Sequence, residues 1–187
     1  MGSERSLPPV VLTDDLWRRV LAVTPGDSVT GRRNRALLHA LYFCGLRISE
    51  ALALRGDDVD RGARTVRVRR GKGGKSRIVA LPNAAAEELA PLLERCGRGL
   101  VFATSSGAPV LTSYVRAWLK RTAKLVGVDR LHAHGARHAH ALHLVEAGIP
   151  LHYIRDDLGH SNIATTDTYI ARLNPKARVN AIVNAYE

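Results

Sequence analysis

The sequence is short of cysteine and of long apolar runs, and each shortage excludes a class of protein. Its 187 residues include only two cysteines, Cys44 and Cys96, which are too few for a disulfide framework. The longest apolar stretch, residues 36–46, is interrupted by His39 and falls below the roughly 18 residues that cross a bilayer. The first residues, MGSERSLPPV, lack the apolar core of a signal peptide. We therefore expect a protein of the reducing cytoplasm that does not enter a membrane.

Acidic residues are also scarce. The chain has 28 Lys and Arg against 17 Asp and Glu, a formal net charge of +11. The excess lies within residues 61–137, where 16 basic residues meet 4 acidic ones, and residues 61–77 hold eight basic residues and no acid. A block of one sign suits a phosphate backbone, so nucleic acid or an acidic membrane face is the expected partner. A basic protein without such a partner is the alternative.

The patterning predicts one domain that is mainly α with a small antiparallel β-sheet. Hydrophobic residues make up 45% of the chain, enough for a core. Thr13 is placed to cap a helix that passes through Trp17 and ends before Pro25. The alternation at residues 65–69, the glycine-rich stretch 71–74 and the return over 75–81 predict a basic β-hairpin. Further helices are predicted over 32–43, from 47, from a cap at Asn83, and over 112–126, 134–147, 150–158, 163–172 and 175–185.

Six polar residues are candidates for chemistry: Arg47, Lys72, His134, Arg137, His160 and Tyr169. A tyrosine hydroxyl has a free pKa of about 10, so it needs nearby cations to stabilise its anion and the phosphorane it forms. Two arginines can bind phosphate oxygens through their guanidinium forks, histidines can move protons, and a lysine can protonate the leaving oxygen. This set would suffice for phosphoryl transfer to tyrosine without a metal.

Each of these signals alone also fits a structural role. Arg47 fits the start of a surface helix, Tyr169 fits a core position, and the hairpin fits a non-catalytic DNA contact. A histidine-rich metal protein is a further alternative, since five of the eight histidines are close in sequence: His132, His134, His138, His140 and His143. No Cys-x-x-Cys pair accompanies them, so neither a metal nor another cofactor is expected.

Four sequence boxes, in this order, resemble those of the tyrosine recombinases, the phage integrase and Xer-type family. Residues 44–50 (Cys-Gly-Leu-Arg-Ile-Ser-Glu) resemble the first catalytic-arginine box, and residues 71–77 (Gly-Lys-Gly-Gly-Lys-Ser-Arg) resemble the lysine hairpin. Residues 134–138 match the third box, His-x-x-Arg-His. The fourth box has two parts, Leu-Gly-His-Ser at residues 158–161 and Thr-Thr-x-x-Tyr at residues 165–169. The boxes extend over most of the chain, so the resemblance implies the integrase-like catalytic core fold.

The resemblance implies a site-specific recombinase that needs neither metal nor ATP. Arg47 and Arg137 would clamp the scissile phosphate. Tyr169 would attack it, giving a 3′-phosphotyrosyl bond and a free 5′-hydroxyl. Lys72 would protonate that hydroxyl, with Lys75 as a competitor for this role. The bond to tyrosine would conserve the energy of the phosphodiester and allow the strands to be rejoined.

The remaining implied roles concern support and binding. His134 and His160 would hydrogen-bond the phosphate or assist proton transfer, and Glu50 would buttress the arginine box. Double-stranded DNA, held in a tetrameric synapse of identical chains, is the implied partner, so the protein is expected at the nucleoid. A monomer in the absence of DNA is left open. The basic hairpin supplies the expected DNA contacts, which are Arg67, Arg69, Arg70, Lys75 and Arg77.

The sequence departs from the family pattern in three places and in length. Ala136 and Asp157 stand where leucine is usual, and His140 stands where an aromatic residue is common. The stretch before Arg47 is too short for an N-terminal core-binding domain, so residues 1–187 are expected to form the catalytic domain alone. A DNA-binding or regulatory module, not competent for recombination alone, is the alternative function. The segment after Tyr169 is expected either to dock on a neighbouring protomer or to pack on its own domain.

Overall fold

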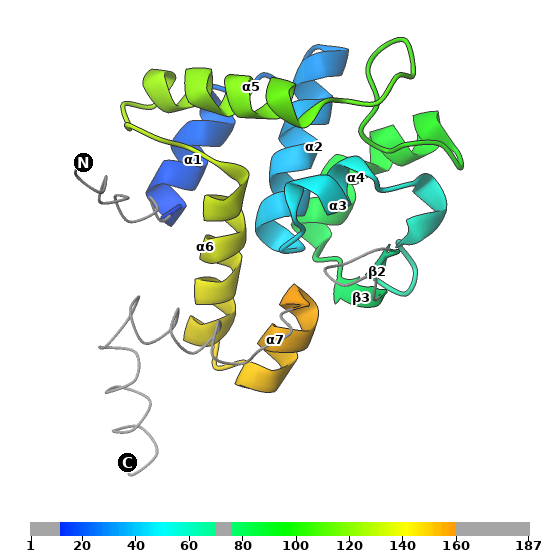
Figure 1. The fold of residues 1–187 in the computed structure, drawn as a ribbon, viewed down its shortest axis with the longest axis vertical. Coiled ribbons are helices and arrows are strands. Elements are labelled where there is room, and N and C mark those ends of the chain that lie inside the picture. Colours follow the sequence, from blue (N-terminus) through cyan, green and yellow to red (C-terminus); the bar gives the residue numbers. More distant parts are fainter. Residues whose placement is uncertain (1–11, 70–75, 160–187) are drawn as a thin grey trace, which may run out of the picture.

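A computed structural model describes residues 12–69 and 76–159 of the chain. Its helices and strands follow one another as α1 (Asp14–Ala22), α2 (Val29–Phe43), α3 (Ile48–Leu52), the 3-10 turn η1 (Gly56–Asp58), β1 (Val59–Asp60), β2 (Thr65–Val68), β3 (Arg77–Ala80), α4 (Asn83–Cys96), α5 (Thr112–Leu125), α6 (Ala133–Glu146) and α7 (Leu151–Leu158). The mainly helical class with a small antiparallel sheet is confirmed (Figure 1). The predicted helices over 163–172 and 175–185 lie outside the described residues.

Side-chain caps account for the starts of α1 and α2. Thr13 caps α1 as predicted, because its hydroxyl accepts from the Leu16 N–H (3.3 Å). α2 begins at Val29 rather than at residue 32, because Ser28 caps it by accepting from the Gly31 N–H (3.0 Å). The prediction of a cap at Asn83 was wrong. Pro82 holds the extended cap position instead, and Asn83 is the first residue of α4.

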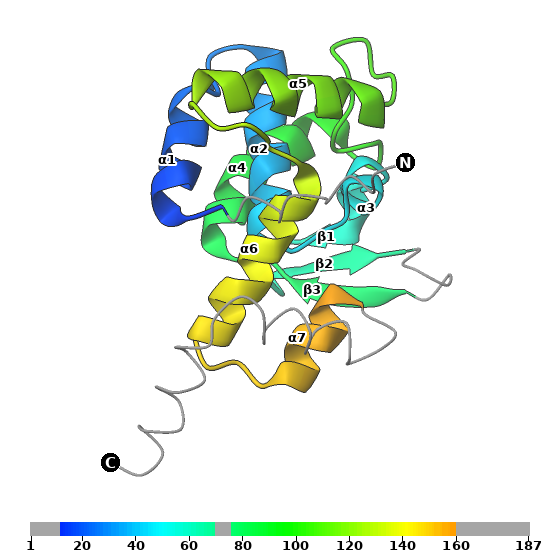
Figure 2. The ribbon, with the colours of Figure 1, turned by 60° about the vertical axis from the view of Figure 1, so that its left-hand side comes forward.

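α2 forms the centre of the core. Its residues from Ala36 to Tyr42 are all buried, and α4 and α6 pack against it (Figures 1 and 2). Leu37 and Leu41 are about 1% exposed or less, and burying such a side chain is worth roughly 1.5–3 kcal/mol. The first arginine box follows directly from the end of this buried helix, so the core fixes where the box lies.

The three strands form one antiparallel sheet in the order β1-β2-β3. Val66 pairs with Val79 on the buried face, and Arg67 pairs with Ile78 on the opposite face. β1 was not predicted, because two residues carry no alternation to detect. α7 packs between β3 and the end of α6, with Ile154 and Leu158 buried in a small cluster (Figure 2). This packing carries the end of α7 to the arginine box.

No helix in the part of the chain that the structure describes is both long and apolar enough to cross a membrane.

Candidate active site

Arg47 is the N-cap residue of α3 and lies just beyond the turn that ends α2. Gly45 makes that turn with φ +57°, a conformation in which glycine has no steric penalty. The Arg47 main-chain N–H donates to Glu50 Oε2 (2.8 Å), and Arg47 Nη1 donates to Glu50 Oε1 (2.8 Å). One glutamate therefore fixes both the backbone and the side chain of this arginine.

Glu50 is the centre of a cluster of three arginines. Its side chain is only 3% exposed, and it binds Arg47, Arg77 (Nη1 2.8 Å and Nη2 2.9 Å) and, at 4.0 Å, Arg137. Burial raises the pKa of Glu50, but hydrogen bonds from Arg77 and Arg47 outweigh it and bring that pKa down to about 2. Glu50 is therefore ionised at neutral pH. Three guanidinium groups share this one carboxylate, so positive charge remains in excess over Glu50.

Arg77 is placed differently from what the sequence analysis expects of a DNA contact. Its side chain is 11% exposed, and both terminal nitrogens grip the two oxygens of Glu50. This bidentate geometry is the one that suits an arginine–carboxylate pair. Arg77 is thus a second arginine bound to Glu50, and it helps to hold the cluster together.

Arg137 lies on α6 and is almost fully buried, with 3% of the residue exposed. Its Nη1 donates to the Gly45 carbonyl (2.5 Å), and its Nη2 donates to the Leu158 carbonyl. Burial, together with the charges of Arg47 and Arg77, lowers the pKa of Arg137 to about 9. The guanidinium is still charged at neutral pH, so a buried positive charge faces the arginine box.

The end of α7 binds all three arginines through its main chain. The Asp157 carbonyl accepts from Arg77 Nε (2.7 Å), and the Gly159 carbonyl accepts from Arg47 Nη2 (3.2 Å). The Leu158 carbonyl between them accepts from Arg137. Carbonyls at a helix C-terminus lack helical partners and carry partial negative charge, so they are suited to guanidinium groups. The last turn of α7 thereby aligns the cluster.

His134 lies one turn before Arg137 on α6. His132 caps the start of α6, because its Nδ1 accepts from the Gly135 N–H (2.9 Å). Partial burial of the His134 ring, then the charges of Arg137, His132 and Arg47, lower the pKa of His134. It is therefore neutral at pH 7, and its ring lies edge-on to His138 with 3.9 Å between centroids.

Arg67 on β2 and Arg69, the residue just after its end, both bind an acidic pair. Arg69 binds Asp58 (2.6 Å) and Asp57 (2.8 Å), while Arg67 binds Asp58 (3.3 Å). The side chains of Arg69 and Arg67 remain 45% and 55% exposed, whereas that of Asp58 is 1% exposed. These ion pairs hold the two guanidinium groups in place while leaving them open to solvent.

Five of the predicted site residues fall outside the described residues: Arg70, Lys72, Lys75, His160 and Tyr169. The structure therefore brings together Arg47, Glu50, Arg77 and Arg137, with His134 one helical turn away on α6. Among residues 12–69 and 76–159, no group of three or more His, Cys, Asp or Glu side chains is arranged to hold a metal ion.

Sequence reasoning missed two features. The Arg77–Glu50 pair joins residues 27 positions apart, and no local pattern signals it. A row of exposed basic residues on α5 was also overlooked, although their spacing places them near one another on a helix. These are Arg116, Lys120, Arg121 and Lys124.

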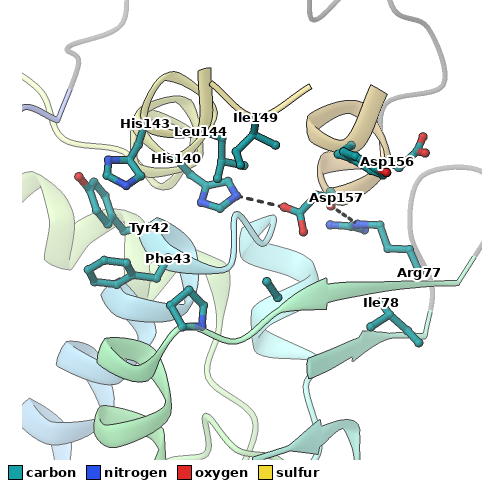
Figure 3. A pocket seen from close by; sticks show the side chains of 13 residues that line it. Tyr42, Phe43, Arg77, Ile78, His140, His143, Leu144, Ile149, Asp156 and Asp157 are labelled. Atoms are coloured by element: carbon teal, nitrogen blue, oxygen red, sulfur yellow. Dashed lines mark hydrogen bonds and ion pairs between the residues drawn. The ribbon is translucent and has the colours of Figure 1, made fainter. Parts of the chain in front are cut away.

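A mostly apolar cavity of about 790 Å³ adjoins the cluster between α2, β3, α6 and α7. Phe43, Ile78, Leu144 and Ile149 line it, and Arg77 lies at its edge (Figure 3). Neither Arg47 nor Arg137 belongs to its lining. The cavity is therefore a separate feature of the surface that meets the cluster at Arg77.

The fold and the arginine site are those of the tyrosine recombinase catalytic core. The model of the phage integrase family matches residues 11–175. The chain belongs to this family, as the four sequence boxes indicated.

Relatives and solved structures agree. The chain is 37% identical over 175 residues to the tyrosine recombinase XerC of Rhodospirillum centenum, a match that covers 89% of this chain and 51% of the relative. It superposes on the crystal structure of XerA recombinase with a TM-score of 0.81 at 26% identity, over 97% of this chain and 66% of that one. For XerH site-specific recombinase bound to difH substrate after cleavage, the TM-score is 0.77 at 25% identity, over 98% and 54%. The chain spans about half the length of the curated relatives it matches first.

Proposed function

We propose that the chain is the catalytic domain of a site-specific DNA recombinase that cleaves and rejoins strands through a phosphotyrosyl intermediate. The observation that carries this proposal is the cluster of Arg47, Arg77 and Arg137 around a single buried carboxylate. Such a cluster is pre-organised for an anion, because its positive charge is fixed in place before the ligand arrives. A scissile phosphate is the anion that fits, and Tyr169 in the fourth sequence box is the proposed nucleophile.

The proposed reaction needs no metal and no nucleotide. The Tyr169 hydroxyl oxygen bonds to phosphorus and gives its proton to a histidine or to water as the bond from phosphorus to the 5′-oxygen breaks, and Lys72 gives that 5′-oxygen its proton. In the reverse step the 5′-hydroxyl oxygen attacks the phosphorus, the bond from phosphorus to the tyrosine oxygen breaks, and the protons return, so no high-energy cofactor is consumed. His134, neutral at pH 7, and His160 are proposed to hydrogen-bond the phosphate oxygens or to pass protons.

The two clamping arginines are proposed to act differently. The side chain of Arg47 is 27% exposed, so its fork can reach a phosphate from solvent. Arg137 lies behind it with 4% of its side chain exposed. We assign Arg137 mainly to electrostatic stabilisation of the pentavalent phosphate, which strengthens as water is excluded. Arg77 and Glu50 are proposed as positioning residues, because Glu50 fixes the Arg47 side chain and Arg77 fixes Glu50.

Double-stranded DNA is the proposed partner. The basic row of α5 supplies positive charge on a described surface, and Arg67 and Arg69 add exposed guanidinium groups that also pair with Asp57 and Asp58. Phosphate contacts of basic side chains dominate DNA affinity. We further propose that Arg70 and Lys75 add to this contact, that four copies form the synapse, and that the protein acts at the nucleoid.

Covalent capture on DNA of random sequence tests the proposal. A pool of nicked duplexes with randomised sequence is incubated with the protein, and DNA that stays attached in SDS is recovered and sequenced. We expect an adduct on Tyr169, detected by mass spectrometry as a nucleotide-bearing peptide, and its loss in Tyr169→Phe with DNA binding unchanged. If the unsubstituted protein binds DNA but forms no adduct in any fraction, the alternative of a binding module is favoured and the proposed chemistry is overturned.

A further inference from the structure

The side-chain pair of His140 and Asp157 lies directly beside the arginine cluster. His140 follows Arg137 by one turn on α6, and Asp157 is in the last turn of α7. His140 Nε2 donates to Asp157 Oδ2 (3.0 Å), and the two side chains are 8% and 20% exposed (Figure 3). A buried pair of polar groups needs such a bond, because leaving either partner unsatisfied is costly.

The pair joins the two segments that hold Arg137. On one side, the His140 ring is packed so closely on Gly45 that a Cβ at Gly45 would lie 2.5 Å from His140 Cδ2. On the other side, it bonds to Asp157. The two carbonyls that accept from Arg137 belong to Gly45 itself and to Leu158, the residue after Asp157. His140 therefore contacts both segments that supply the acceptors of Arg137.

The same pair also bears on the other two arginines. The Asp157 side chain is tied to His140 while its own carbonyl accepts from Arg77 Nε (2.7 Å). Two residues later, the Gly159 carbonyl accepts from Arg47 Nη2 (3.2 Å). A shift of α7 relative to α6 would move these acceptors together, because they lie on consecutive residues of one helix end.

We propose that His140 and Asp157 form a positioning pair that sets the last turn of α7, and with it the three arginine acceptors, for phosphate binding in the transition state. This rests on the function proposed above. The structure places these two side chains in contact with each other. The pair is separate from the residues proposed to touch the phosphate.

Substitutions that remove one partner at a time test the proposal. His140→Phe keeps a ring but removes the donor, Asp157→Ala removes the acceptor, and Asp157→Asn keeps an acceptor oxygen. The double variant His140→Phe, Asp157→Leu replaces the polar pair by an apolar one. Asp156→Ala is the matched control, because its carboxylate is the neighbouring one on α7 and binds the exposed Arg155 instead.

The first readout does not depend on activity. Side-chain Nε–H signals of arginines are followed by NMR in the full chain, with the melting temperature as a check of folding. We expect the signals of Arg77 and Arg137 to shift or broaden in His140→Phe and Asp157→Ala, and to stay in place in Asp157→Asn, the double variant and the Asp156→Ala control. Unchanged signals in both His140→Phe and Asp157→Ala would overturn the proposal.

The second readout is the rate of covalent adduct formation on the nicked duplexes, at saturating DNA. A misplacement of catalytic groups by about 1 Å can lower a reaction rate about a hundredfold. We therefore expect a partial shift to slow cleavage about tenfold in His140→Phe and in Asp157→Ala. DNA affinity should change less than about twofold, and the double variant should regain most of the rate. A loss of rate that the double variant does not restore contradicts a positioning pair. If wild type forms no adduct, the proposed function fails, while the NMR readout still decides whether the pair orders the arginines.

Discussion

Replacing Glu50 by glutamine should remove the charge that holds the arginine cluster together. The substitution keeps the size of the side chain but leaves three guanidinium groups without their shared carboxylate. The pKa of Glu50 falls from 4.5 to about 2 on folding, and each unit of pKa is worth about 1.4 kcal/mol, so the carboxylate stabilises the fold by about 3 kcal/mol at neutral pH. Breaking one partner out of a buried ion pair typically costs about 3–5 kcal/mol, which agrees with this value.

The pH dependence of this cost has a definite sign. Because folding lowers the pKa of Glu50, its stabilisation is fully present above the unfolded value of 4.5 and is lost as the pH falls toward about 2. The difference in unfolding free energy between wild type and Glu50→Gln should therefore be about 3 kcal/mol at pH 7 and less than about half of that at pH 3.

Urea denaturation at a series of pH values measures this difference. Glu88→Gln is the control, because Glu88 forms a more exposed pair with Arg35 (2.7 Å, with 26% of the Glu88 side chain exposed); this variant should cost less than about 1 kcal/mol. A Glu50→Gln cost below about 1 kcal/mol at pH 7, or one that does not shrink in acid, would refute the view that Glu50 neutralises the cluster.

Three further predictions concern the surroundings of the site. Gly45→Ala should destabilise the protein by about 2–4 kcal/mol in urea denaturation, since it combines a positive φ with a Cβ clash. Gly127→Ala is the control, because Gly127 has φ +69° but open space around it, and it should cost only about 1–2 kcal/mol. Equal costs for the two substitutions would contradict the clash. Burial, then the charge of a nearby aspartate, raises the pKa of Cys44 to about 12, so iodoacetamide at pH 8 should label the partly exposed Cys96 but reach Cys44 only after denaturation, as peptide mass spectrometry would report. Asp57→Asn should release Arg69 Nη2 and remove one negative charge beside Arg67 and Arg69, while both arginines keep their bonds to Asp58. This change should tighten DNA binding severalfold at low salt and steepen its salt dependence; an unchanged affinity would mean that Arg69 does not meet DNA.

Local sequence signals predicted the elements but not the contacts between them. Thr13 and the alternation of residues 65–69 act through their immediate neighbours in sequence, so α1 and β2 were expected where they occur. The cap of α4 was misjudged by one residue, because an extended Pro82 can begin a helix without a side-chain bond.

The arginine box was recognised from its resemblance to a family, whereas the partners of its arginines were not. The basic block in the sequence predicts Arg77 as a DNA contact. Its pairing with Glu50 cannot be seen in the sequence, because only the pairing of β3 with β2 and the packing of α7 bring the two residues together. The acceptors at the end of α7 are main-chain atoms, which residue identities cannot reveal. Long-range geometry of this kind depends on the assembled core.

The use of backbone carbonyls at the end of α7 has a consequence for how this site tolerates mutation. Every residue type carries a main-chain carbonyl, so a substitution at Asp157 or Leu158 cannot delete an acceptor of Arg77 or Arg137 as long as the backbone keeps its course. A single inserted or deleted residue in α7 would instead rotate its end by about 100° and carry all three carbonyls away from the arginines at once. The length of α7 therefore acts on all three acceptors directly, whereas the side chain of Asp157 acts on them only through the course of the backbone.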